Sequence, residues 1–166
     1  MKAIIVMGVA GSGKTSVARK LAAARGQAYV EGDDFHPSAN IHKMREGIPL
    51  DDDDRRGWLL SLCAEMAKYP QGCVLACSAL KRSYRDVFRE ALPGLCFVYL
   101  HIPLQEAQRR VAERSGHFYP PSLVDSQFDT LEDPSEEKDV AHIDAMGPTG
   151  NMLQVVQQAL LELAEN

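Results

Sequence analysis

The sequence has no apolar run long enough to span a bilayer, and it has no excess of basic side chains. The longest apolar run near the start covers residues 3–9, far short of the roughly 20 residues that a membrane-spanning helix needs. The single Lys before this run does not make a secretory signal. Acidic residues outnumber Lys and Arg by 23 to 18, which argues against nucleic acid held through phosphate contacts. We therefore expect neither a membrane span nor a nucleic-acid partner.

The sequence also lacks paired cysteines. Its four cysteines form no C-x-x-C pair, have no zinc-finger spacing and lie in or beside apolar segments. Buried, reduced thiols are the simplest interpretation, and they suit a reducing cytoplasm.

No linker or repeat divides the chain. With 166 residues and 45% hydrophobic side chains, it has the size and composition of one domain with one core. We expect a single domain over residues 1–166. Residues 115–121 and the polar residues 132–139 are predicted to be mobile surface excursions.

Short apolar runs alternate with segments of helical period, which predicts an α/β fold with a parallel sheet. Ligands of such a sheet bind beyond the carboxyl ends of the strands. The expected strands cover residues 3–7, 28–30, 73–77, 95–101 and 140–143. The expected apolar helix faces contain Val17, Leu21 and Ala24, then Trp58, Leu59, Leu62, Cys63 and Met66, then Tyr84, Val87 and Phe88, and finally Leu153, Val156, Leu160 and Leu163.

A phosphate-binding loop follows the first expected strand. Residues 8–15 match G-x-x-x-x-G-K-[ST] at every fixed position. Lys14 is expected to neutralise the β- and γ-phosphates of a nucleoside triphosphate, and the Thr15 hydroxyl is placed to ligate Mg²⁺. The predicted nucleotide-binding residues are Gly8, Val9, Ala10, Gly11, Ser12, Gly13, Lys14 and Thr15.

The rest of the chain selects among phosphate-loop proteins. The guanine-reading N-K-x-D is absent, and D-x-x-G at residues 54–57 opens a helical pattern, so a GTPase is not favoured. No later strand ends in the aspartate that is typical of motor ATPases. Acidic residues instead follow the second expected strand, as Glu31, Asp33 and Asp34, which is the arrangement of small-molecule kinases.

Further motifs resemble the gluconate kinase family in nearly unbroken order, up to about residue 134. They are residues 32–37 (GDDFHP), Asn40, Lys43, Met44, Gly47, residues 49–50 and 52–55, Trp58, residues 77–81 (CSALK) and 84–86, residues 116–118 (GHF), and residues 127–128 and 130–132. The resemblance implies a three-layer P-loop kinase fold with a five-stranded parallel sheet and a mobile lid over about residues 115–125. It also implies kinship with shikimate and nucleoside monophosphate kinases, and it suggests a homodimer.

Two acids are expected beside the phosphates. Asp33 is placed to orient the attacking hydroxyl and accept its proton. Glu31 occupies the position at which related kinases carry a metal-facing acid, so it is expected to hold a water on Mg²⁺. The family usually has Asp there, and Glu is longer. A solvated acidic turn is the alternative for both residues.

The expected substrate ligands surround this cluster. Arg55 offers a planar fork for a carboxylate, the alternative being a surface ion pair with neighbouring aspartates. Ser78, Lys81 and Arg85 follow the third strand, where hydroxyl and cationic groups suit a polyhydroxylated anion, or where they serve as a helix cap and a wet helix face. His36 either contacts substrate or stabilises a turn.

The lid is expected to supply arginine. Arg110 and Arg114 are four residues apart and are predicted to share one helix face. By resemblance they serve a lid that closes over ATP, the alternative being exposed helix charge. His117 either touches substrate or anchors the lid.

The phosphate loop predicts a site for Mg·ATP, and the resemblance implies transfer of the γ-phosphoryl group to the terminal hydroxyl of D-gluconate. A cytoplasmic location is expected. Catalytic roles are expected for Lys14, Asp33, Arg110 and Arg114. Two alternatives are a kinase for another metabolite such as shikimate, and a nucleotide-binding module without transfer activity.

Overall fold

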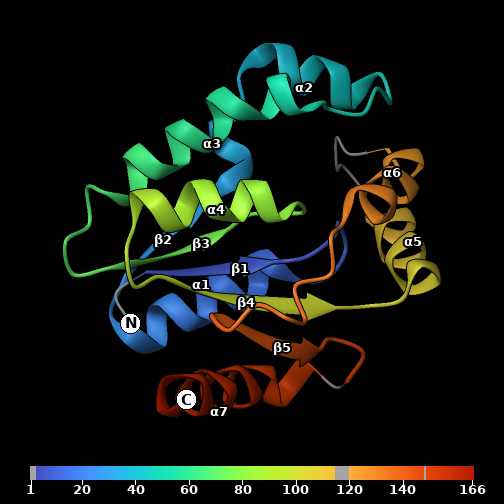
Figure 1. Cartoon of the computed structure of the whole chain (residues 1–166). Helices are drawn as coiled ribbons and strands as arrows, with labels where there is room; N and C mark the ends of the chain where they lie inside the picture. Colours follow the sequence, from blue (N-terminus) through green and yellow to red (C-terminus); the bar gives the residue numbers. More distant parts are fainter. Residues whose placement is uncertain (1–2, 115–119, 148) are drawn as a thin grey trace.

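A five-stranded parallel sheet forms the centre of the molecule (Figure 1). The computed structural model describes residues 3–114, 120–147 and 149–166. Within one residue at each end, the strands match those expected from the sequence. They are β1 (Ile4–Met7), β2 (Ala28–Glu31), β3 (Cys73–Ala76), β4 (Cys96–His101) and β5 (Val140–Asp144).

The strand order is β2-β3-β1-β4-β5, so β1 is central. Ile5 of β1 is in register with Leu75 of β3 on one side and with Phe97 of β4 on the other. The chain therefore leaves β1 at the point where successive strands are added on opposite sides. Ligands of open parallel sheets bind at this switch point.

Helices cover both faces of the sheet, which confirms the three-layer α/β fold. Ile4 and Val6 belong to one buried cluster with α1 and α7, whereas Ile5 and Met7 belong to a second cluster with α3 and α4. Figure 1 shows α3 and α4 above the sheet and α1 and α7 below it. The helices are α1 (Lys14–Arg25), α2 (Ser38–Arg45), α3 (Asp52–Met66), α4 (Arg82–Ala91), α5 (Leu104–Glu113), α6 (Ser122–Thr130) and α7 (Met152–Glu165), with 3₁₀ turns η1 (Gly32–Phe35) and η2 (Thr149–Asn151).

The predicted apolar face is complete in α3, where all five residues are buried, but not in α1. Val17 and Leu21 of α1 are buried as expected, but Ala24 is exposed. Ala18 and Ala22 are buried instead. The buried stripe of α1 therefore runs through the i and i+4 pairs Val17/Leu21 and Ala18/Ala22, and it ends at Ala22 instead of Ala24.

The four cysteines are free and buried, as expected. In the described part of the chain, no helix has both the length and the apolar character that crossing a bilayer requires.

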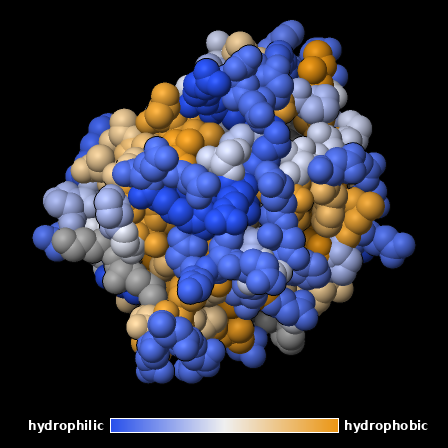
Figure 2. Space-filling model, in the orientation of Figure 1, coloured by the Kyte–Doolittle hydropathy of each residue, from blue (hydrophilic) through white to orange (hydrophobic). Residues whose placement is uncertain are grey.

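The prediction of a mobile excursion at residues 132–139 is wrong. The Glu132 N–H donates to the Leu80 carbonyl at 2.8 Å, and the Arg85 guanidinium binds the Glu137 carboxylate at 2.8 Å. The Glu137 side chain is only 6% exposed. A strongly hydrophilic area lies at the centre of the face in Figure 2, where α4 and this segment meet. Ion pairs thus fix the segment to α4.

Candidate active site

The loop after β1 is shaped by glycines. Gly8 has φ 147°, and a Cβ added there would lie 2.8 Å from the Leu100 carbonyl oxygen, so a larger residue would collide with β4. Gly13, at φ 94°, precedes α1, and no side chain caps the helix. The first N–H groups of α1 therefore lack a side-chain acceptor, which is the geometry that binds phosphate at a helix N-terminus.

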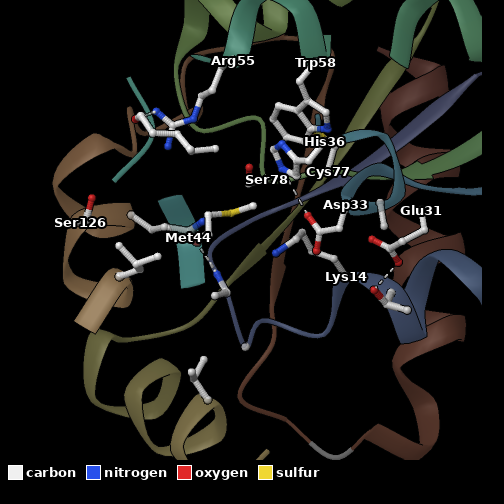
Figure 3. Close-up of a pocket in the computed structure, with 18 of the residues that line it drawn as sticks. Lys14, Glu31, Asp33, His36, Met44, Arg55, Trp58, Cys77, Ser78 and Ser126 are labelled. Carbon is white, nitrogen blue, oxygen red and sulfur yellow. Dashed lines mark hydrogen bonds and ion pairs between the residues drawn. The ribbon is translucent and has the colours of Figure 1, made fainter. Parts of the chain in front are cut away.

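Lys14 lies at the mouth of this loop and lines a pocket together with Asp33 (Figure 3). Its ammonium donates to the Val9 carbonyl at 2.9 Å. Loss of hydration lowers the pKa of Lys14, and the Asp33 carboxylate opposes that shift. An anion bound in the loop would favour the charged ammonium in the same way.

Thr15 and Glu31 form the oxygen-rich side of the pocket. The Thr15 hydroxyl donates to Glu31 Oε2 at 2.7 Å. Mg²⁺ prefers oxygen ligands and is usually held through one or two carboxylates together with substrate phosphates. Among the described residues, no group of three or more His, Cys, Asp or Glu could hold a metal ion. A hydroxyl and a carboxylate beside the phosphate loop are the few protein oxygens that fit a Mg²⁺ ion whose other ligands are nucleotide phosphates and water.

Asp33 reaches the pocket because Gly32 permits a tight turn after β2. A Cβ at Gly32 would collide with the Ala76 carbonyl oxygen at the end of β3. The indole N–H of Trp58 donates to the Gly32 carbonyl at 2.8 Å, which ties the turn to α3. The Asp33 side chain remains 58% exposed and lines the pocket. A carboxylate is thereby held beside Lys14.

His36 is buried against α3. Its ring stacks on Trp58 with centroids 4.1 Å apart, and the Asn40 side-chain nitrogen lies 3.3 Å from Nδ1. Burial, helped by the nearby Arg55 charge, lowers the pKa of His36 to about 4. The imidazole is therefore neutral at pH 7, and its 3.8 Å approach to Asp33 is not an ion pair there.

Arg55 provides a buried cation on the other side of the pocket. It is 8% exposed, and Nη1 donates to the Leu50 carbonyl at 2.6 Å and to the Tyr84 hydroxyl at 3.2 Å. A capping box between Asp51 and Asp54 fixes the start of α3, so Arg55 stands on a rigid first turn. Figure 3 shows Arg55 across the pocket from Lys14 and Glu31.

Several other predicted residues lie elsewhere. Arg85 is fully buried, and its guanidinium is occupied by the carbonyls of Ala79, Leu80 and Glu132 and by Glu137. The expectation that Arg85 binds substrate is therefore corrected, because it has no face toward the pocket. Lys81 pairs with Asp52 at 2.9 Å and does not line the pocket. Ser78, in contrast, is a lining residue.

The two arginines of the expected lid separate. The α5 helix ends at Glu113, and Arg114 is extended at φ −74° and ψ 114°, so they do not share a helix face as predicted. Arg114 lines the pocket. Arg110 donates to the carbonyls of Gly11 in the phosphate loop and of Ala145, at 3.1 and 2.9 Å, and is not among the residues that line the pocket. His117 and most of the lid's first half lie outside the described residues.

The sequence analysis noted Gln127 of α6 only within a family motif and assigned α6 no place in the site. Leu123, Ser126 and Gln127 line the pocket, and the Ala10 N–H donates to Gln127 Oε1 at 2.6 Å. No periodicity could reveal this contact because 117 positions separate the two residues. Met44, Pro49, Leu50 and Trp58 also line the pocket. They belong to motifs that sequence analysis had noted without assigning them a place in the site.

Known proteins share this arrangement over nearly the whole chain. A family model described as an AAA domain matches residues 4–135. The thermosensitive gluconokinase of Escherichia coli is 38% identical over 169 residues, which cover 99% of this chain and 90% of that protein. The gluconokinase of Gluconobacter oxydans is 46% identical, over 84% of this chain and 80% of that protein. The chain belongs to the gluconokinase family.

Solved structures agree with membership of the gluconokinase family. A gluconokinase from Sinorhizobium meliloti superposes with a TM-score of 0.91 at 46% identity, covering 99% of this chain and 94% of that one. Shikimate kinase from Acinetobacter baumannii superposes with a TM-score of 0.63 at 17% identity. The second match shows the fold alone.

Proposed function

We propose that the chain transfers the γ-phosphoryl group of Mg·ATP to the terminal hydroxyl of D-gluconate and forms 6-phosphogluconate. The observation that carries this proposal is one pocket with a phosphate loop on one side and the buried Arg55 on the other. A guanidinium matches a carboxylate in shape and charge. Gluconate has its carboxylate at one end and its terminal hydroxyl at the other, so Arg55 and Asp33 would bind opposite ends.

The nucleotide would be held by the loop and its neighbours. Backbone N–H groups of the loop and Lys14 would bind the phosphates, and Arg114 would face the transferring group. Thr15 and Glu31 would hold Mg²⁺, which supplies positive charge to the phosphate oxygens during transfer. Lys14 suits this role because it is an ammonium whose loss of hydration a bound phosphate would offset.

Asp33 would orient the acceptor. Its carboxylate would accept a hydrogen bond from the terminal hydroxyl, whose oxygen forms the new bond to the γ-phosphorus as the bond to the β-phosphate oxygen breaks. The hydroxyl proton would pass to Asp33 and then to solvent. The neutral His36 and Ser78 can donate or accept hydrogen bonds with the remaining hydroxyls.

Substrate identity is tested by measuring ADP release with gluconate, other sugar acids, shikimate and nucleoside monophosphates. We expect release with gluconate and a product identified as 6-phosphogluconate. Turnover of shikimate without turnover of gluconate would overturn the substrate, and ATP binding without any turnover would indicate a binding module.

The role of Asp33 is tested with a matched neighbour. Asp33→Asn should lower kcat by roughly 10²–10⁴-fold, the usual contribution of general acid–base catalysis. Asp34→Asn changes the same charge at the next, exposed position, which does not line the pocket, and should leave kcat nearly unchanged. Equal effects of the two variants would contradict the assignment.

A further inference from the structure

Glu31 receives a second hydroxyl besides that of Thr15. Tyr29 and Glu31 are two residues apart on β2, so their side chains point to the same face of the sheet. The Tyr29 hydroxyl donates to Glu31 Oε2, the same oxygen that accepts from Thr15. Within the described ranges, no hydrogen bond is made to Glu31 Oε1. Two donors thus hold one carboxylate oxygen and leave the other for another partner.

Tyr29 is itself held in place. Its ring is half-buried against the cluster below the sheet, and the Arg19 guanidinium lies 5.3 Å from the ring centroid. Tyr29 is therefore a hydroxyl donor on a restrained ring.

We propose that Tyr29 is a positioning residue that orients the Glu31 carboxylate toward the Mg²⁺ ion of a bound Mg·nucleotide. A glutamate has three side-chain torsions, and ordering a free one costs conformational entropy that a preset hydrogen bond removes. Partners of this kind commonly change metal affinity by about 10–100-fold when they are removed. This inference rests on the proposed use of Mg·ATP, but it does not depend on which acceptor is phosphorylated.

The test is ADP binding by calorimetry, with Mg²⁺ and with EDTA. Tyr29→Phe removes only the hydroxyl, and we expect it to reduce the gain in ADP affinity that Mg²⁺ produces by about tenfold. Affinity for metal-free ADP should stay within about twofold of wild type, because the phosphate loop is untouched. That second value also reports whether the variant is folded.

Tyr69→Phe is the matched control. The Tyr69 hydroxyl donates to the Glu65 carboxylate at 3.2 Å, on α3 and the turn after it, away from the pocket. This variant should leave both ADP affinities unchanged. The proposal would be overturned if Mg²⁺ raised the ADP affinity of Tyr29→Phe as much as that of wild type. It would also be overturned if both variants lost the Mg²⁺ effect equally, or if Mg²⁺ did not raise the ADP affinity of wild type. Failure of wild type to phosphorylate gluconate, with the Mg²⁺ effect intact, would overturn only the substrate assignment.

Discussion

A neutral histidine in the pocket of an enzyme for an anionic substrate has a clear electrostatic basis at the scale of the single residue. His36 shares the pocket lining with Arg55, and burial together with that cation disfavours its protonation. A protonated His36 would repel Arg55 and leave a buried charge beside Trp58. The imidazole is therefore suited to hydrogen bonding with a polyol and not to binding a carboxylate.

Burial of His36 makes the stability of the fold depend on pH, in a direction set by its lowered pKa. The folded pKa of His36 is about 4, below its ordinary value of about 6.5, so between these values the unfolded chain binds more protons. Stability should fall as pH drops from about 6.5 to 4, by up to about 3 kcal/mol in total. We would measure the unfolding free energy by urea denaturation at several pH values across this range. It should change less with pH in His36→Gln than in wild type.

A surface histidine serves as the control for this experiment. His42 of α2 is exposed. The unfolding free energy of His42→Gln should therefore depend on pH as in wild type. If the unfolding free energy of His36→Gln also depended on pH as in wild type, the fold would not hold His36 neutral.

Gln127 gives a second prediction for a single residue. Its side-chain oxygen accepts from the Ala10 N–H of the phosphate loop at 2.6 Å. Gln127→Glu keeps the acceptor but places a negative charge beside the proposed phosphates. We expect ATP to bind roughly tenfold more weakly, since a like charge close by costs on the order of 1 kcal/mol or more in a partly buried site.

The control for Gln127→Glu changes the same charge at the far end of the sheet. Gln71 is exposed in the segment before β3. The phosphate loop follows β1 and so lies at the opposite end of the parallel strands. Gln71→Glu should leave ATP affinity within about twofold. Comparable weakening in both variants would point to net charge and not to the contact with Ala10.

At the scale of elements, the sequence predicted the features that neighbouring residues in the chain determine, namely the strands and the phosphate loop. The strands read as short apolar runs, and the central strands β1, β3 and β4 are buried on both faces almost throughout, so the strand limits were correct to one residue. The phosphate loop was recognisable because the backbone conformation of the loop requires its glycines. Arg85 was misplaced because a helix-start arginine gives no sign that residues 132–139, far along the chain, will surround it. The same reason concealed the contact of Gln127, whose partner Ala10 lies across the fold.

Arg85 makes the junction between α4 and residues 132–139 a testable element. Arg85→Met would remove the donor to three carbonyls and a partner of the buried Glu137. We expect a loss of about 3 kcal/mol or more in unfolding free energy, measured by urea denaturation, because breaking a buried pair strands its polar groups.

A neighbouring arginine provides the comparison. Arg82 lies 3.7 Å from the same carboxylate, but its side chain is 68% exposed. Arg82→Met should cost less than about 1 kcal/mol, as exposed ion pairs usually do. Similar losses in both variants would show that burial of the Arg85 guanidinium is not what stabilises the junction.

At the scale of the whole molecule, every layer contributes to the pocket. The central strand leads into the phosphate loop, α3 above the sheet supplies Arg55 and Trp58, and α6 closes the side with Ser126. The site therefore requires the assembled fold, and we expect the chain to unfold as one cooperative domain.

Ligand-linked unfolding tests this cooperativity. The single Trp of the sequence is Trp58, which lines the pocket, so its fluorescence reports the site while far-UV circular dichroism reports all helices. Both signals should follow one transition. Mg·ADP at about 100 times its Kd should stabilise the fold by about 2.7 kcal/mol and raise the Tm in both signals together by about 5–10 °C.

Lys14→Ala separates binding from folding in this experiment. The variant should keep one transition in both signals but lose most of the shift with Mg·ADP, because Lys14 is the cation of the phosphate loop. A shift in Trp58 fluorescence without a matching shift in circular dichroism would contradict a single domain. It would instead indicate that the helices around the pocket unfold separately from the sheet, so that nucleotide stabilises only part of the chain.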